Sequence, residues 1–158
     1  YGNNLVFEMD QAEAIRQGYL ASLVYKGFID DVDYTNIYYN GFRYDVNDLN
    51  KSLMIDKRDQ AVLEKFNELA PDKKTIAFCV SIEHADWAAS KFVEAGIDAV
   101  SIHSKIDHNY TSGAYQSSIE IIDAFDQDKH QVAFVVDMLN EGIEAFYHDL
   151  MKLNCLSI

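Results

Sequence analysis

Residues 74–103, KTIAFCVSIEHADWAASKFVEAGIDAVSIH, decide the fold of this chain. They begin with an apolar run at 75–80, continue with helical spacing up to Gly96, and return to an apolar run at 98–103. A short run without polar alternation is typical of a strand whose two faces are both covered by helices. Two such strands joined by a helix are typical of a parallel βαβ unit with a right-handed crossover.

The pattern repeats further along the chain. Residues 114–128 have helical spacing, with Ile119, Ile122 and Phe125 on one face, and residues 131–136 form a third apolar run. The alternation of strand and helix predicts an α/β domain with a parallel sheet.

The N-terminal part has a different pattern. Residues 9–20 predict a short capped helix, and residues 20–29 predict a strand. Residues 32–44 predict a second extended stretch that contains an Asn-Gly turn. Apolar residues then recur at three- and four-residue steps over 45–69, which predicts helical structure that ends at Pro71.

Residues 32–44 are rich in aromatic side chains, and two interpretations of them remain open. The rings could form a platform on which nucleic-acid bases stack, or they could simply pack within a hairpin, and we favour ordinary packing. The residues concerned are Tyr34, Tyr38, Tyr39, Phe42 and Tyr44.

Composition limits the classes of function. The 158 residues are 49% hydrophobic, which is enough for one sizeable core. The net charge of −13 repels a phosphate backbone at long range, so the chain by itself should bind nucleic acid poorly. We expect a soluble, cytoplasmic protein with no membrane-spanning segment. Cys79 and Cys155 lie in apolar contexts, which favours buried thiols over a disulfide or a zinc site.

Functional residues of an open parallel sheet lie just beyond the carboxyl ends of its strands. Ser81 follows the first strand and opens a helix, so it either binds an anion or is only an N-cap, and the capping role is favoured. His103, Ser104 and Lys105 follow the second strand. They could contact a phosphate, or a loop carbonyl could satisfy His103.

The third strand leads into Asp137, Asn140, Glu141 and Gly142. These residues could form a carboxylate cluster that binds a metal or activates water, but no second acidic cluster supports this idea. The phosphate-binding patterns GxxxxGK[ST] and GxGxxG are absent. We therefore expect no catalytic residue and no metal ligand in this chain alone.

Four stretches together resemble the second RecA-like lobe of superfamily 2 helicases and translocases, in particular DEAD/DEAH-box relatives such as restriction-enzyme motor subunits and DNA-repair helicases. The resemblance implies a RecA-like three-layer α/β/α fold with a mainly parallel sheet, preceded by a short helix and strand region. Residues 1–44 would be a lead-in from a first lobe, and residues 45–158 the lobe itself, truncated after motif V. The stretches are NNLVFEMDQAEAIRQGYL (3–20), KTIAFCVSIEHA (74–85), AVSIHSK (99–105) and IEIIDAFDQDKHQVAFVVDMLNEGIE (119–144).

The same resemblance implies roles for the strand-end residues. Ser81 and Ile82 match motif IV and would contact phosphates of the tracked strand. The next motif would contribute backbone contacts from the second strand end, and motif V would contact nucleic acid and the nucleotide between two lobes, with its glycine allowing close approach. The residues of these last two groups are His103, Ser104 and Lys105, then Asp137, Asn140, Glu141 and Gly142.

The resemblance also implies ATP and magnesium as cofactors of an intact parent, DNA or RNA as the polymer, and a partner lobe that carries a phosphate loop. No cofactor is expected on this chain alone. The family's QxxGRxxR motif has no counterpart, and no arginine follows Arg58. Residues 145–158 have a more helical pattern than the family has there. An alternative is a non-catalytic adaptor or regulator that keeps the fold, and a weaker one is a flavodoxin-like ligand-binding domain.

Overall fold

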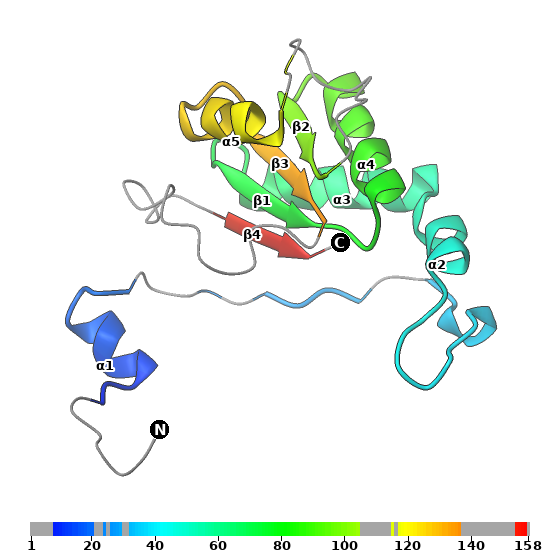
Figure 1. Cartoon of the computed structure of the whole chain (residues 1–158), viewed down its shortest axis with the longest axis horizontal. Coiled ribbons are helices and arrows are strands. Elements are labelled where there is room, and N and C mark those ends of the chain that lie inside the picture. Colours follow the sequence, from blue (N-terminus) through cyan, green and yellow to red (C-terminus); the bar gives the residue numbers. More distant parts are fainter. Residues whose placement is uncertain are drawn as a thin grey trace.

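A computed structural model of the chain describes residues 8–20, 24, 26–29, 32–104, 115 and 117–136, together with the backbone of 154–157 (Figure 1). The described helices and strands, in chain order, are α1 (Gln11–Arg16), the 3-10 turn η1 (Tyr34–Asn36), α2 (Val46–Leu53), α3 (Asp56–Leu69), β1 (Thr75–Phe78), α4 (Ile82–Glu94), β2 (Ala99–Ile102), α5 (Ser118–Asp126), β3 (Val132–Val135) and β4 (Asn154–Ser157).

The four strands form one parallel sheet in the order β2-β3-β1-β4. Strand β3 therefore lies between β2 and β1, although it follows both of them in the sequence. The predicted α/β class with a parallel sheet is confirmed, and the arrangement is consistent with a RecA-like fold.

Helices cover both faces of this sheet, which gives three layers. On one face, Phe66 of α3 and Phe92 of α4 pack against Phe134 of β3. On the other face, Ile121 and Phe125 of α5 pack against side chains of β1, β2 and β3. Because both faces are covered, β2 and β3 are buried along their whole length, as their continuous apolar runs predict.

Side-chain caps and one glycine set the limits of the central helices. Ser81 and Ser117 accept hydrogen bonds from backbone N–H groups in the first turns of α4 and α5. Gly96, just beyond α4, has φ +82, a backbone conformation that residues other than glycine rarely adopt. The longest described helix, α3, has 14 residues. In the described ranges, no helix is long and apolar enough to cross a membrane.

The helical pattern over 45–69 corresponds to two helices, α2 and α3. Met54 and Ile55 separate them, and Ile55 is extended, with φ −132 and ψ 132. A β-branched side chain tolerates this conformation well, and Asp56 and Asp59 then lie in the first turn of α3, where carboxylates are favourable. Residues 56–60 are all polar, so the apolar spacing is interrupted just after the break.

The ends of the chain depart from prediction. The helical pattern of 145–158 is wrong at residues 154–157, which form β4 and pair with β1. In the predicted strand at 20–29, Val24 and residues 26–29 form no strand, and most of the remaining positions lie outside the described residues. The predicted N-terminal helix is confirmed as α1, which lies apart from the sheet in Figure 1. The Asn-Gly turn is confirmed between Tyr39 and Tyr44, which form an antiparallel bridge.

Candidate functional site

The first three strands end on the same rung of the sheet. Phe78, the last residue of β1, pairs with Val135, the last residue of β3, and Val135 also pairs with Ile102, the last residue of β2. Because the strands are parallel, the residues that follow them leave the sheet at one common edge. Ser81 after β1 and His103 after β2 therefore lie at the same carboxyl edge.

Ser81 uses its hydroxyl group within the protein. The oxygen accepts a hydrogen bond from the backbone N–H of His84 at 3.0 Å, and the hydroxyl donates to Oδ1 of Asn50 at 2.7 Å. The predicted capping role is thus confirmed. A hydroxyl group has one hydrogen to donate, so the donors left at this end of α4 are the backbone N–H groups of Ile82 and Glu83, which have no partner within the helix.

A carboxylate lies beside the same helix end. The buried side chain of Asn50 on α2 donates a hydrogen bond to Oε2 of Glu83 at 2.9 Å. Glu83 is in the first turn of α4, where a negative charge is favourable. An anion that binds to the N–H groups of this turn would meet repulsion from the Glu83 carboxylate.

His103 is almost wholly buried, with 2% of its surface exposed. Its Nε2 lies 2.9 Å from Oδ1 of Asp86 on α4, and its backbone carbonyl accepts a hydrogen bond from the Ser118 hydroxyl. The same Asp86 oxygen accepts a hydrogen bond from Ser101 of β2. One ring nitrogen of the imidazole is thus paired with a carboxylate, where the sequence suggested a loop carbonyl. The next residue, Ser104, is exposed.

Two further groups below this edge have strongly shifted pKa values. Burial, with a smaller contribution from Arg58, lowers the pKa of His84 to about 4, and no described residue makes a hydrogen bond to either of its ring nitrogens. Burial raises the pKa of the Cys79 thiol to about 12. At neutral pH the imidazole of His84 is therefore uncharged and Cys79 is a thiol, so neither supplies a charge or a thiolate to the site.

Five of the predicted site residues lie outside the described part of the chain, so their positions in the site stay predictions. They are Lys105, Asp137, Asn140, Glu141 and Gly142. Among the residues that the structure does describe, no three histidine, cysteine, aspartate or glutamate side chains form a group that could hold a metal ion.

Sequence reasoning missed two residues that support this edge. Asn50 is a polar residue at an inward-facing position of α2, three residues before the buried Leu53. A polar residue on an apolar helix stripe can signal a buried hydrogen bond, and this was the available clue. Asp86 had no comparable signal, because its partners Ser101 and His103 belong to a different element.

No protein-family model matches the chain, and no curated protein matches it. Among solved structures, the chain is similar to the crystal structure of the Hef helicase domain of Pyrococcus furiosus, with 19% sequence identity and a TM-score of 0.35. The matched region covers 52% of this chain and 15% of that chain, so this chain spans a small part of that protein. A similarity at this level does not support a conclusion about function.

Proposed function

We propose that this chain is the C-terminal RecA-like lobe of an ATP-dependent helicase or translocase. It would contribute contacts to the nucleic-acid backbone and one side of an ATP cleft, and it would be inactive alone. The observation that supports this proposal best is the common rung of Phe78, Ile102 and Val135, with α4 beginning at Ile82 directly beyond β1. This arrangement directs a helix N-terminus and two further strand ends to the same edge.

The contact that we propose uses backbone N–H groups at the start of α4. Ile82 and Glu83 would donate to a phosphate oxygen, while the Ser81 hydroxyl keeps the helix start in place through Asn50. Ser104 and Lys105 would add contacts from the end of β2. His103 would act by position, because its buried ring holds the end of β2 against Asp86.

The nucleotide side of the proposal uses the segment after β3. Asp137, Asn140, Glu141 and Gly142 would face ATP and magnesium bound to a partner lobe that carries a phosphate loop. The chain lacks such a loop and has no arginine after Arg58 to reach a γ-phosphate. Purified protein should therefore not hydrolyse ATP, with or without DNA or RNA, and substantial stimulated turnover would overturn this part of the proposal.

A proline substitution tests the backbone contact directly. Ile82→Pro removes one N–H at the first position of α4, where proline is well tolerated. The preceding Ser81 has φ −156 and ψ 162, an extended conformation compatible with a following proline. We expect the affinity for fluorescein-labelled oligothymidine, measured by anisotropy at about 0.15 M salt so that the long-range repulsion is screened, to fall about tenfold.

Two variants serve as controls for this measurement. Ile82→Ala shortens the side chain but keeps the N–H, and Val46→Pro removes the equivalent N–H of α2, whose cap Asp45 is also extended. Both should bind oligothymidine as the original chain does, and circular dichroism should show that all three variants are folded. Equal affinity of Ile82→Pro and the original chain would exclude the α4 amide contact.

The second candidate function is a non-catalytic adaptor that retains the fold. The net charge of −13, and the Glu83 carboxylate held beside the α4 N-terminus, favour it because both repel phosphate. The same anisotropy experiment separates the two candidates. A folded chain with no measurable affinity for DNA or RNA at about 0.15 M salt, where the repulsion is screened, would favour the adaptor.

A further inference from the structure

The hairpin that precedes α2 is held by its own hydrogen bonds. Tyr39 and Tyr44 form an antiparallel bridge, and the Asn40 side chain accepts hydrogen bonds from the N–H groups of Phe42 and Arg43, both at 3.0 Å. Gly41 between them has φ +93, which favours glycine. The turn is therefore ordered by local polar contacts and does not depend on burial of its rings.

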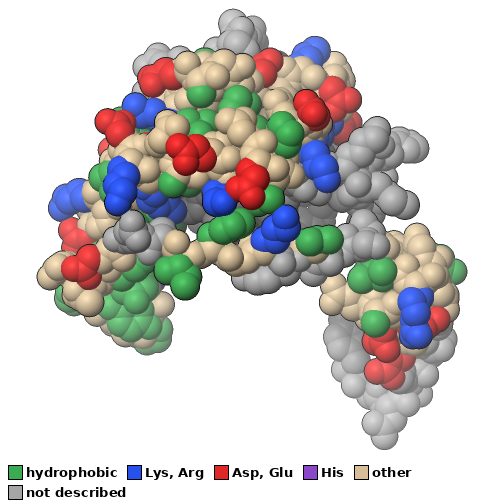
Figure 2. All heavy atoms as spheres, turned by 180° about the vertical axis from the view of Figure 1, so that it is seen from behind, with side chains coloured by type: hydrophobic (Ala, Val, Ile, Leu, Met, Phe, Trp, Pro, Cys, Tyr) green, Lys and Arg blue, Asp and Glu red, His purple; other side chains and the backbone are tan. Residues whose placement is uncertain are grey.

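The same hairpin exposes large aromatic side chains. The exposed fraction is 94% for Phe42, at the tip, and 66% for Tyr38. Figure 2 shows hydrophobic side chains gathered at the lower left of the molecule, over the segment that leads into α2. A gathering of exposed rings marks an interaction site more often than a scattered single residue does. We call Tyr38, Tyr39, Phe42 and Tyr44 the aromatic hairpin patch.

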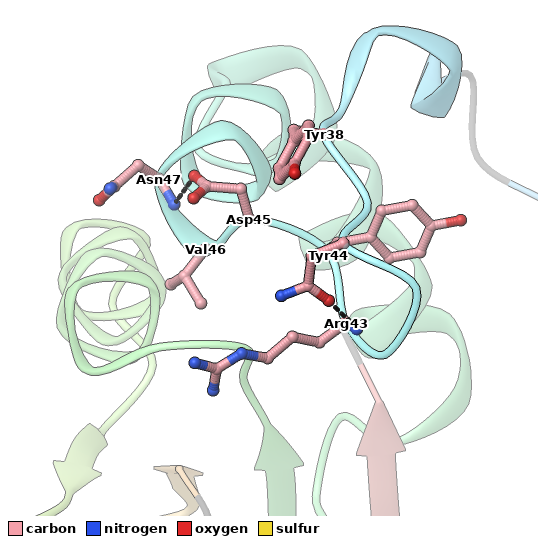
Figure 3. Close-up of a pocket in the computed structure, with 7 residues that line it drawn as sticks. Tyr38, Arg43, Tyr44, Asp45, Val46 and Asn47 are labelled. Atoms are coloured by element: carbon pink, nitrogen blue, oxygen red, sulfur yellow. Dashed lines mark hydrogen bonds between the residues drawn. The ribbon is translucent and has the colours of Figure 1, made fainter.

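Arg43 is the cation of this hairpin, and its side chain points away from the ring of Tyr44 (Figure 3). A small hollow separates the hairpin from the start of α2. Figure 3 shows the Arg43 side chain extending along the hollow towards Val46, while the ring of Tyr44 points the opposite way. The patch is thus not a simple pairing of rings with a phosphate-binding cation.

The charges around the patch decide which partner suits it. Residues 32–51 contain three aspartates, Asp33, Asp45 and Asp48, and two cations, Arg43 and Lys51, of which Lys51 pairs with Asp48 at 3.1 Å. Hydrogen bonds from Thr35 lower the pKa of Asp33, so it is ionised at neutral pH. Stacking on single-stranded nucleic acid works with a positively charged groove, whereas these residues have a net negative charge and the whole chain carries −13. Aromatic faces beside carboxylates instead favour the cations of arginine and lysine.

We propose that the aromatic hairpin patch is a docking surface for a protein segment that presents arginine or lysine together with apolar side chains. The partner's cations would lie over the tyrosine rings and near the aspartates, and its apolar side chains would cover Phe42. Aromatic residues are the types that most often dominate the affinity of protein interfaces. The proposal does not depend on the proposed function, because it uses none of the residues assigned there.

The test uses three fluorescein-labelled probes, read by anisotropy. They are a synthetic peptide of alternating arginine and leucine, its counterpart with glutamate in place of arginine, and oligothymidine. We expect the arginine peptide to bind the original chain, and the double variant Phe42→Ser/Tyr38→Ser to bind it about tenfold more weakly. The affinities for the other two probes should be the same for both proteins.

A matched double variant controls for general changes of the surface. Val93→Ser/Ile119→Ser replaces two exposed apolar residues on α4 and α5, and it should bind the arginine peptide as the original chain does. The proposal is overturned if the arginine peptide fails to bind, or if it binds the hairpin variant and the original chain equally. It is also overturned if oligothymidine binding is lost in the hairpin variant, because the patch would then be a base-stacking surface.

Discussion

The sheet with its helices and the hairpin before α2 both contain many aromatic rings, but they hold their structure by different means. In the sheet region, Phe92 is 2% exposed and contacts Phe66 and Phe134 with ring centroids 5.2 and 5.0 Å away. In the hairpin, Phe42 is 94% exposed and the order comes from hydrogen bonds between near neighbours. Residue type alone therefore does not decide burial, since contacts between distant segments decide it.

The largest expected difference is in the free energy of unfolding when one phenylalanine of each region is replaced by alanine. Phe92→Ala should lower the free energy of unfolding by about 3–5 kcal/mol, because it leaves a cavity between α3, α4 and the sheet. Phe42→Ala should change it by no more than about 0.5 kcal/mol, because the exposed ring loses little on removal. Urea unfolding followed by circular dichroism measures both, and a large loss for Phe42→Ala would refute the comparison.

A second difference should appear on acidification, because the hairpin contains no histidine whereas the sheet region buries His84. Its pKa is about 4 in the folded chain and 6.5 in the unfolded chain, so the unfolded chain binds the extra proton first. Stability is therefore present above pH 6.5 and is lost as the pH falls towards 4. By pH 4.5 this loss should reach about 2–3 kcal/mol.

The variant His84→Leu isolates this contribution, because leucine fills the buried site without titrating. Urea unfolding of both proteins between pH 7 and 4.5 should show a steeper loss for the original chain. Parallel pH profiles for the two proteins would show that the pKa of His84 is the same in the folded and the unfolded chain.

The smallest expected difference concerns a single hydrogen-bond donor in each region. The Trp87 indole donates to the buried Asp59 carboxylate at 2.7 Å, whereas the Tyr39 hydroxyl donates to the Gly41 carbonyl at an exposed site. Trp87→Phe should cost about 1–3 kcal/mol, because it leaves a buried acceptor unsatisfied, and Tyr39→Phe should cost much less.

The pH dependence of the Trp87→Phe effect checks its cause. Burial raises the pKa of Asp59, and loss of the indole donor should raise that pKa further. A protonated Asp59 is uncharged and loses less free energy when the indole N–H is removed. The destabilisation measured by urea unfolding should therefore shrink as the pH falls. An effect of equal size at pH 7 and at acid pH would point to lost packing of the indole ring instead.

The βαβ pattern could be predicted from the sequence because it depends on the local spacing of apolar residues. The apolar runs at 75–80, 98–103 and 131–136 correspond to β1, β2 and β3, and Ser81 caps α4 as its position suggested. The common carboxyl edge follows from the parallel pairing of these strands.

The features that could not be predicted depend on partners far away in the chain. Asp86 binds Ser101 and His103, and Asn50 binds Ser81, across distances in sequence that no periodic pattern reports. The strand β4 has no distinctive alternation of its own, and it is defined by pairing with β1. The exposure of the aromatic hairpin patch likewise depends on what the rest of the chain leaves uncovered.

The position of β1 has a consequence for how the chain folds during synthesis. Both neighbours of β1 in the sheet, β3 and β4, come later in the sequence, so β1 leaves the ribosome before either of its pairing partners exists. Closing parallel pairs between distant segments is slow, and unpaired strand edges favour aggregation in the meantime. We therefore expect this chain to need chaperone protection until β4 has been made.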